Sequence, residues 1–379
     1  MNFDRLDAHL KAFYEIHPNL PGCDILVQQN HRTLYRQQYG YADLQNKIPL
    51  RGEEIYCMYS CSKPITVAGV MRLMQDGLLD LDAPVSRYLP CFADAYLLEN
   101  TQKRNVSKSI TIRHLLTMTA GFTYDLNTEP IKALFKQNDH RIPTTEFAKA
   151  LLASPLAFEP GTRYNYSLCH DLLGAVIEAV SGVSFGEYLH RNIFEPLGMT
   201  RTGFFSTLPA DTQPIPMYIW KASEQNAVPF IDYFDCGLNR HYQSGGAGIL
   251  STVEDYGKFA ATMAHGGQSV DGYELLKAET LEMMRQEQLS AIVSEGTFVC
   301  AAGPGYGYGL GVRTLINRNG GQRSPIGEFG WDGAAGAYVL MDTDNDLSIF
   351  YATHLRNWHG GFGSIHAPIR DLVYECLGL

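Results

Sequence analysis

Both ends of this 379-residue chain show the pattern of two strands beside a helix, and this arrangement limits the possible folds most strongly. Apolar residues recur at helical spacing over residues 4–16 and again over 367–377. Strand-like runs lie near each end in pairs, with turn residues between the two members, over 24–28, 33–40, 336–341 and 347–353. We therefore expect one sheet assembled from the two chain ends, with a helical region inserted between them.

Composition excludes several classes of protein. Hydrophobic residues make up 45% and charged residues 18%, which is typical of a folded chain and too apolar for disorder. A net charge of -10 disfavours nucleic acid as a partner. The first residues lack the pattern of a signal peptide, and no apolar run is long enough to span a membrane. The eight cysteines have no zinc-site spacing, so we expect no metal and reduced thiols in a cytoplasmic protein.

Ser60-Cys61-Ser62-Lys63 is a Ser-x-x-Lys sequence at the start of a predicted helix over 62–75. Pro64 is compatible with the first helical turn, and residues three apart in one turn face the same side. Burial and the positive end of the helix dipole would disfavour an ammonium, so a neutral Lys63 could activate the Ser60 hydroxyl. The Ser60 N–H would then be one donor for an oxyanion. The alternative is that Ser60 is an N-cap and Lys63 a solvated surface residue.

A second candidate nucleophile is Ser184, in the sequence Gly182-Val183-Ser184-Phe185-Gly186. This Gly-x-Ser-x-Gly pattern forms a nucleophile elbow only where it follows a strand and precedes a helix. Residues 170–180 have helical periodicity instead, and Glu187 follows Ser184 at the spacing of a capping box. We therefore expect Ser184 to cap a helix.

Three further motifs accompany Ser60 and Lys63 along the chain. They are Tyr166-Ser167-Leu168, the glycine-rich run 245–252 and the run Gly-Glu-Phe-Gly-Trp-Asp-Gly-Ala-Ala-Gly at 327–336. With them the chain resembles the class C branch of the serine β-lactamase and penicillin-binding-protein superfamily, over nearly its whole length. Further landmarks agree in the same order, at 40–43, 77–85, 111–116 and 196–200.

The resemblance implies a β-lactamase/transpeptidase-like α/β sandwich, in which an antiparallel sheet with flanking helices carries an inserted, mostly helical region. We predict that residues 1–75 and 245–379 form a discontinuous sheet domain and that 76–244 form the inserted domain. The active site would lie at their junction. Within the insertion, prolines interrupt aromatic residues over 204–244, which suits a loop folded over a pocket.

The same resemblance implies roles for individual residues. Ser60 corresponds to the acylated nucleophile, Lys63 to its base partner and Tyr166 to the tyrosine that shuttles the proton. Ala334 would supply the second oxyanion N–H, opposite that of Ser60. No cofactor is expected, because side chains and backbone amides suffice for this chemistry.

The chain departs from the superfamily pattern where substrate is held. Trp331-Asp332-Gly333 replaces the usual Lys-Thr-Gly or His-x-Gly, so the cation that helps to hold a substrate carboxylate is missing, and Asp332 would repel a carboxylate if it faced the site. Leu168 replaces an asparagine expected to bind an acylamino group. The class C branch sometimes places substrate-contacting groups where His354, Arg356 and Asn357 end a predicted strand.

These departures are similar to the family VIII carboxylesterases. We therefore expect a serine hydrolase that acts on esters with small or medium acyl groups through a Ser60 acyl-enzyme. The expected substrate-binding residues are Trp331, Asp332, Gly333, Leu168, Trp220 and Tyr218. The alternatives are a β-lactamase, a D-amino-acid peptidase or an acyltransferase of the same superfamily and, more remotely, a non-hydrolytic binding or scaffold protein that keeps the fold.

Overall fold

The two ends of the chain meet in one sheet. A computed structural model describes residues 2–137, 142–230, 241–290, 303–358 and 360–379. Strand β1 (Gly22–Gln29) pairs antiparallel with β14 (Leu347–Thr353), and their register runs from Cys23 opposite Thr353 to Gln29 opposite Leu347. The predicted assembly of the sheet from both chain ends is thereby confirmed.

The main sheet has eight strands in the order β10-β11-β12-β13-β14-β1-β2-β3, and every neighbouring pair is antiparallel. The remaining strands of this sheet are β2 (Arg32–Asp43), β3 (Ile48–Pro49), β10 (Tyr306–Tyr308), β11 (Arg313–Leu315), β12 (Phe329–Asp332) and β13 (Tyr338–Asp342).

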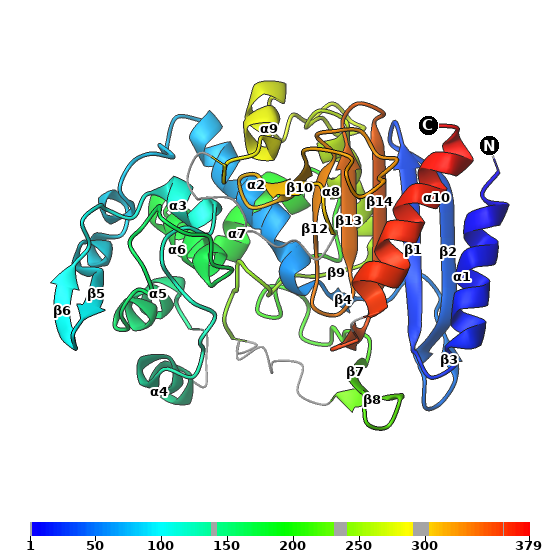
Figure 1. Ribbon diagram of the computed structural model, residues 1–379, viewed down its shortest axis with the longest axis horizontal. Coiled ribbons are helices and arrows are strands. Elements are labelled where there is room, and N and C mark those ends of the chain that lie inside the picture. Colours follow the sequence, from blue (N-terminus) through cyan, green and yellow to red (C-terminus); the bar gives the residue numbers. More distant parts are fainter. Residues whose placement is uncertain (1, 138–141, 231–240, 291–302, 359) are drawn as a thin grey trace.

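Helices cover both faces of this sheet, as the predicted sandwich requires. Helices α1 (Asp4–Ile16) and α10 (Ala367–Leu377) lie on one face, and α8 (Val253–Ala264) packs on the other against β1, β13 and β14 (Figure 1). The alternation of a strand explains this arrangement, because successive side chains point to opposite faces. In β1, Ile25 and Val27 pack with α1 and α10, whereas Leu26 belongs to the cluster that contains α8.

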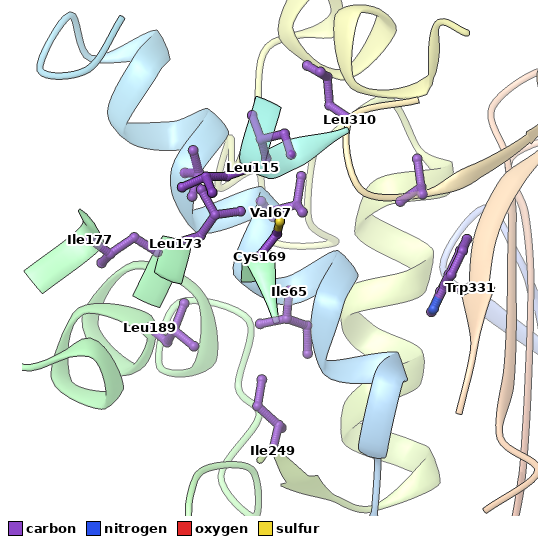
Figure 2. Close-up of a cluster of buried hydrophobic side chains, with 14 of the residues drawn as sticks. Ile65, Val67, Leu115, Cys169, Leu173, Ile177, Leu189, Ile249, Leu310 and Trp331 are labelled. Carbon is purple, nitrogen blue, oxygen red and sulfur yellow. The ribbon is translucent and has the colours of Figure 1, made fainter. Parts of the chain in front are cut away.

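Helix α2 (Ser62–Gln75) lies between the sheet and the helical region. Its residues are buried on nearly all sides, which is the pattern of a helix at the centre of a core. Figure 2 shows Ile65 and Val67 of α2 in one buried cluster with Leu173 of α6 and Trp331 of β12. The helical region around α2 consists of α3 (Ile112–Leu116), α4 (Glu129–Gln137), α5 (Thr144–Leu152), α6 (Cys169–Ser181) and α7 (Phe185–Leu189), with α9 (Ala278–Arg285) nearby.

One prediction about this region is wrong and another is confirmed. Residues 217–230 form no loop but a hairpin of β7 (Met217–Lys221) and β8 (Asn226–Phe230), and β7 pairs in parallel with β15 (Leu355–Arg356). Pro229 fits because β8 is the edge strand of this small sheet, where a missing N–H is tolerated. The rest of the predicted loop includes residues 231–240, which lie outside the described residues. Ser184 caps α7 as predicted, because its Oγ accepts a bond from the Glu187 N–H at 3.4 Å.

The inserted region also contains a hairpin of β5 (Tyr96–Glu99) and β6 (Gln102–Asn105). Its largest buried cluster is shared with the sheet, since Leu26, Val67 and Leu173 all belong to it. The division into domains at residues 75 and 245 therefore stays a prediction.

Within the part of the chain that the structure describes, no single helix has the length and apolarity needed to cross a membrane. Among the described residues, one pair of helical segments, 169–181 and 185–194, has this length and composition when taken together, but the two are bent by 78° relative to each other.

Candidate active site

Ser60 lies in a short helical turn, η1 (Tyr59–Cys61), that leads directly into α2. Tyr59 has a φ of 46°, a left-handed conformation that costs a non-glycine residue roughly 1–3 kcal/mol and persists only where the surroundings impose it. The N-cap of α2 is Cys61, without a side-chain cap bond, and Lys63 is fully buried. The alternative of a capping Ser60 beside a solvated Lys63 is therefore wrong.

Lys63 reaches Ser60 from the first turn of α2. Its Nζ lies 3.0 Å from Ser60 Oγ and donates to the carbonyl oxygen of Gly246 at 2.8 Å. The antiparallel pairing of β4 (Tyr56–Cys57) with β9 (Leu250–Ser251) brings the glycine-rich run beside the Ser60 segment. The 245–252 motif thus contributes a backbone acceptor that holds the amine in place.

Tyr166 is the second group at the Ser60 hydroxyl. Its OH lies 2.7 Å from Ser60 Oγ, and Lys63 Nζ lies 4.7 Å from the centre of its ring. The ring stacks with those of Tyr124 and Trp331, at centroid distances of 5.6 and 5.9 Å. These two neighbours restrict the ring, so the phenolic oxygen keeps its position beside the serine.

Ala334 follows β12 in the turn formed by residues 333–336, and it lines the same cavity as Ser60 and Tyr166. Gly333 allows this turn to lie close to the segment that carries Ser60. A Cβ at this position would lie 2.6 Å from the carbonyl oxygen of Met58, so any other residue would push the turn away from the Ser60 segment. Gly333 therefore has a backbone role in the geometry, and Ala334 as an oxyanion donor stays a prediction.

The cavity beside Ser60 has a volume of about 740 Å³, which is the size of a small-molecule site. Among the described residues, its walls are largely aromatic and aliphatic and include two cations and no carboxylate. The lining residues are Tyr59, Ser60, Tyr124, Leu126, Asn127, Lys132, Phe135, Tyr166, Ala247, Ala334 and Arg356.

Several predicted substrate-binding residues lie elsewhere. Leu168 is fully buried in the core. Tyr218 is buried on β7, where its OH accepts from the Leu44 N–H and contacts Asp43, and Trp220 packs with the cluster between the sheet and α1. Trp331 is 9% exposed and contacts Tyr166 rather than open space, so its geometric role is to support that ring.

Asp332 points into the protein, toward Arg313. Arg313 is fully buried, and its Nη1 lies 3.4 Å from Asp332 Oδ2. Burial alone would raise the pKa of the Asp332 carboxyl, but Arg313 and His366 outweigh burial and hold the pKa below its ordinary value. The negative charge is thus compensated inside the fold, and the repulsion of a substrate carboxylate by Asp332 has no geometric support.

Tyr124, Lys132 and Phe135 line the cavity without having been expected there, because none belongs to a recognisable motif. Lys132 and Phe135 come from α4, and only the fold brings that helix to the cavity.

Arg356 places a positive charge in the wall of the cavity. Its Nε and Nη1 are buried without a hydrogen-bond partner in the described structure, and its guanidinium lies 5.5 Å from the centre of the Tyr59 ring.

Two further titratable groups lie buried on α6, near Lys63. Asp171 accepts a hydrogen bond from Ser244 Oγ at 2.5 Å, and burial raises the pKa of its carboxyl. Burial, and then the charge of Lys63, hold the pKa of His170 well below its ordinary value. Ser244 also accepts from the Ala247 N–H, so Asp171 anchors the turn that provides the Gly246 carbonyl.

The arrangement suits nucleophilic catalysis by side chains. Among the described residues, no group of three or more His, Cys, Asp or Glu side chains is placed to hold a metal ion. A serine hydroxyl within hydrogen-bond distance of two proton-carrying groups, in a cavity of substrate size, matches the geometry of an activated nucleophile.

Comparisons with known proteins agree with this fold. The chain is 29% identical to esterase EstB of Burkholderia gladioli over 381 residues, which cover 94% of this chain and 91% of EstB. The solved structure of EstCE1, described as a hydrolase with promiscuous acyltransferase activity, matches with a TM-score of 0.81 and 26% identity over 98% of each chain.

Simvastatin synthase LovD from Aspergillus terreus has a TM-score of 0.82 over 99% of each chain, and its 22% identity shows the shared fold alone. The β-lactamase family model matches residues 3–373. The chain therefore belongs to the β-lactamase family and is a serine hydrolase with the α/β fold of that family.

Proposed function

We propose that this serine hydrolase is a carboxylesterase that acts on esters with small or medium acyl groups through an acyl-enzyme on Ser60. The observation that carries the proposal is the convergence on Ser60 Oγ of Lys63 Nζ at 3.0 Å and Tyr166 OH at 2.7 Å. Ser60 and Tyr166 line a cavity that is large enough for an ester of this kind. The name of EstB supports the same reaction class.

The first half-reaction transfers the acyl group to the enzyme. The Lys63–Tyr166 pair takes the Ser60 proton while Oγ attacks the ester carbonyl. The N–H groups of Ser60 and Ala334 bind the oxyanion that forms on the carbonyl oxygen. When the C–O bond of the tetrahedral intermediate breaks, the same pair returns the proton to the leaving alcohol.

The second half-reaction restores the serine. A water molecule gives a proton to the Lys63–Tyr166 pair and attacks the acyl-enzyme carbonyl, and collapse of the intermediate releases the acid and reprotonates Ser60 Oγ. General-base assistance of this type accelerates a step by about 10²–10⁴-fold, and each oxyanion donor contributes about 10²–10³-fold.

Support for an ester over a lactam comes from the third motif. Trp331 takes the sequence position of the usual cation and stacks on Tyr166. Because an indole is uncharged, it cannot form an ion pair with a substrate carboxylate. Arg356 lies in the same cavity, and two nitrogens of its guanidinium have no hydrogen-bond partner among the described residues. A charged substrate therefore has a cation available, and lactam turnover has to be measured directly.

The test compares acyl acceptors and donors on one preparation. We expect turnover of p-nitrophenyl acetate and butyrate at least about tenfold above that of a chromogenic β-lactam or a D-alanyl peptide, a difference of about 1.4 kcal/mol in barrier. Ser60→Ala provides the blank for each substrate. Equal or faster lactam or peptide turnover would replace the esterase proposal by that activity, and ester product formed mainly on added alcohol would replace it by acyl transfer.

A further inference from the structure

We propose that His366 is a positioning residue that holds the oxyanion turn, residues 333–336, so that the Ala334 N–H points at the reacting carbonyl. This inference rests on the proposed function, in which Ala334 is an oxyanion donor. It assigns a role to a buried histidine and to Asp332, the unusual second residue of the third motif.

The imidazole of His366 contacts residues on both sides of the turn. His366 is the last residue of the short helical turn η5 (Phe362–His366), directly before α10, and it is 3% exposed. Its Nε2 lies 3.0 Å from the carbonyl oxygen of Gly336, and its Nδ1 lies 3.4 Å from Asp332 Oδ1. One side chain therefore bridges the residue before the oxyanion turn and its last residue.

The far end of this bridge is fixed in the sheet. Asp332 Oδ2 lies 3.4 Å from Nη1 of Arg313, and Nη2 of the same guanidinium donates to the Val339 carbonyl at 2.8 Å. The Tyr338 ring stacks on the imidazole with a centroid distance of 4.7 Å. The chain Arg313, Asp332, His366 and Gly336 thus connects the turn to three strands, β11, β12 and β13.

Packing holds only one part of the turn. Ala335 is buried in an apolar cluster with Tyr59 and Met217, and its carbonyl accepts from the Leu355 N–H at 3.2 Å. Ala334 is exposed and lines the cavity beside Ser60, and both Ala334 and Gly336 line a second, mostly apolar cavity of about 260 Å³. Gly336 has a φ of 92°, and the other backbone bonds here are Gly336 N–H to the Gly333 carbonyl and Gly333 N–H to the Ala337 carbonyl, each 2.8 Å. The His366 contacts add a restraint from outside the turn.

The two contacts of His366, with Gly336 and with Asp332, can be tested one at a time by substitution. The Gly336 carbonyl and the Asp332 carboxylate only accept hydrogen bonds, so a protonated imidazole serves both and a neutral ring serves one at a time. The amide nitrogen of glutamine occupies about the position of Nε2, and that of asparagine about the position of Nδ1. His366→Gln therefore keeps the hydrogen bond to Gly336, whereas His366→Asn keeps only a donor facing Asp332 Oδ1, where the contact of His366 is a 3.4 Å charge contact and not a hydrogen bond.

The experiment measures kcat, KM, melting temperature and the rate of fluorophosphonate labelling for the wild type and for His366→Leu, His366→Gln and His366→Asn. Tyr374→Phe is the matched control, because Tyr374 lies on α10 and donates a buried hydrogen bond to Asp342 Oδ2 at 2.6 Å, away from the turn. We expect the control to lower the melting temperature and leave kcat unchanged.

For His366→Leu we expect kcat and the labelling rate to fall by about tenfold to a hundredfold with little change in KM. A displaced Ala334 N–H would weaken the oxyanion hydrogen bond, which forms mainly in the transition state. His366→Gln should retain more activity than His366→Asn. If the leucine variant does not fold, the glutamine and asparagine pair decides the question.

Equal kcat and labelling rates in the wild type and in every folded His366 variant, with a loss of melting temperature like that of Tyr374→Phe, would overturn the positioning role. Equal activity of the glutamine and asparagine variants would also overturn it. Failure of the proposed acyl-enzyme is distinguishable, since wild-type Ser60 would then take no label at all, and the inference would fall with it. A lactamase, peptidase or acyltransferase would still be labelled, and the ranking of the His366 variants could be measured on that substrate.

Discussion

Replacing Tyr166 by Phe tests the proposed proton path with little change in packing. The substitution removes one oxygen, which lies 2.7 Å from Ser60 Oγ, and keeps the ring that stacks with Tyr124 and with Trp331. The loss of general acid–base assistance should lower kcat by about 10²–10⁴-fold, equivalent to roughly 3–5 kcal/mol of barrier. KM should change little, because the lost interaction acts mainly in the transition state.

The assay is steady-state hydrolysis of p-nitrophenyl butyrate, with thermal unfolding measured on the same samples. One hydrogen bond contributes about 0.5–1.5 kcal/mol to stability, so the melting temperature should fall by only a few degrees. Lys63→Met provides the companion variant, and the double variant should be little worse than either single one if the two groups act as a unit. A kcat for Tyr166→Phe within about threefold of the wild type would refute the reasoning, because general acid–base assistance predicts a loss of at least about a hundredfold.

Three further predictions concern the surroundings of the site. Arg356→Ala should raise KM by about tenfold for an ester that carries a carboxylate and leave a neutral ester unchanged, because only the charged ester loses the attraction of the Arg356 guanidinium in the cavity; equal effects on both esters would contradict this. Ser184→Ala should cost about 0.5–2 kcal/mol in urea unfolding without loss of activity, as expected for a helix cap, and loss of activity would reopen its role as nucleophile. The folded pKa of Asp332 is lowered, so its ion pair with Arg313 should stabilise the protein above about pH 3.9, the ordinary value, and this contribution should disappear as pH falls through the lower folded pKa. Asp332→Asn should therefore be less stable than the wild type near neutral pH, with the difference shrinking in acid; a constant difference across this range would contradict the ion-pair explanation.

Local signals predicted the elements with clear chemical boundaries. Helix α2 covers the predicted residues 62–75, and α10 covers the residues 367–377 whose apolar spacing predicted it. The pairing of β1 with β14 followed from strand patterns at both chain ends. Each of these features depends on residues close together in sequence or on a simple pairing of termini.

Features that depend on partners far apart in the sequence could not be predicted from local patterns. The β7–β8 hairpin was expected to be a loop, because Pro229 is locally unfavourable in a strand and its partner β15 lies far along the chain. The direction of Asp332 depends on buried Arg313, which no motif marks. Tyr124 reaches the site only through the folding of the helical region, and its contact with Tyr166 has no counterpart in the local sequence.

The most direct test of the central claim is the intact mass of the protein after incubation with a fluorophosphonate, measured for the wild type, Ser60→Ala and Ser184→Ala. The account predicts one label on the wild type and on Ser184→Ala, and none on Ser60→Ala. A label that is retained in Ser60→Ala and lost in Ser184→Ala would contradict it, and an unlabelled wild type would favour a binding or scaffold protein that keeps the fold.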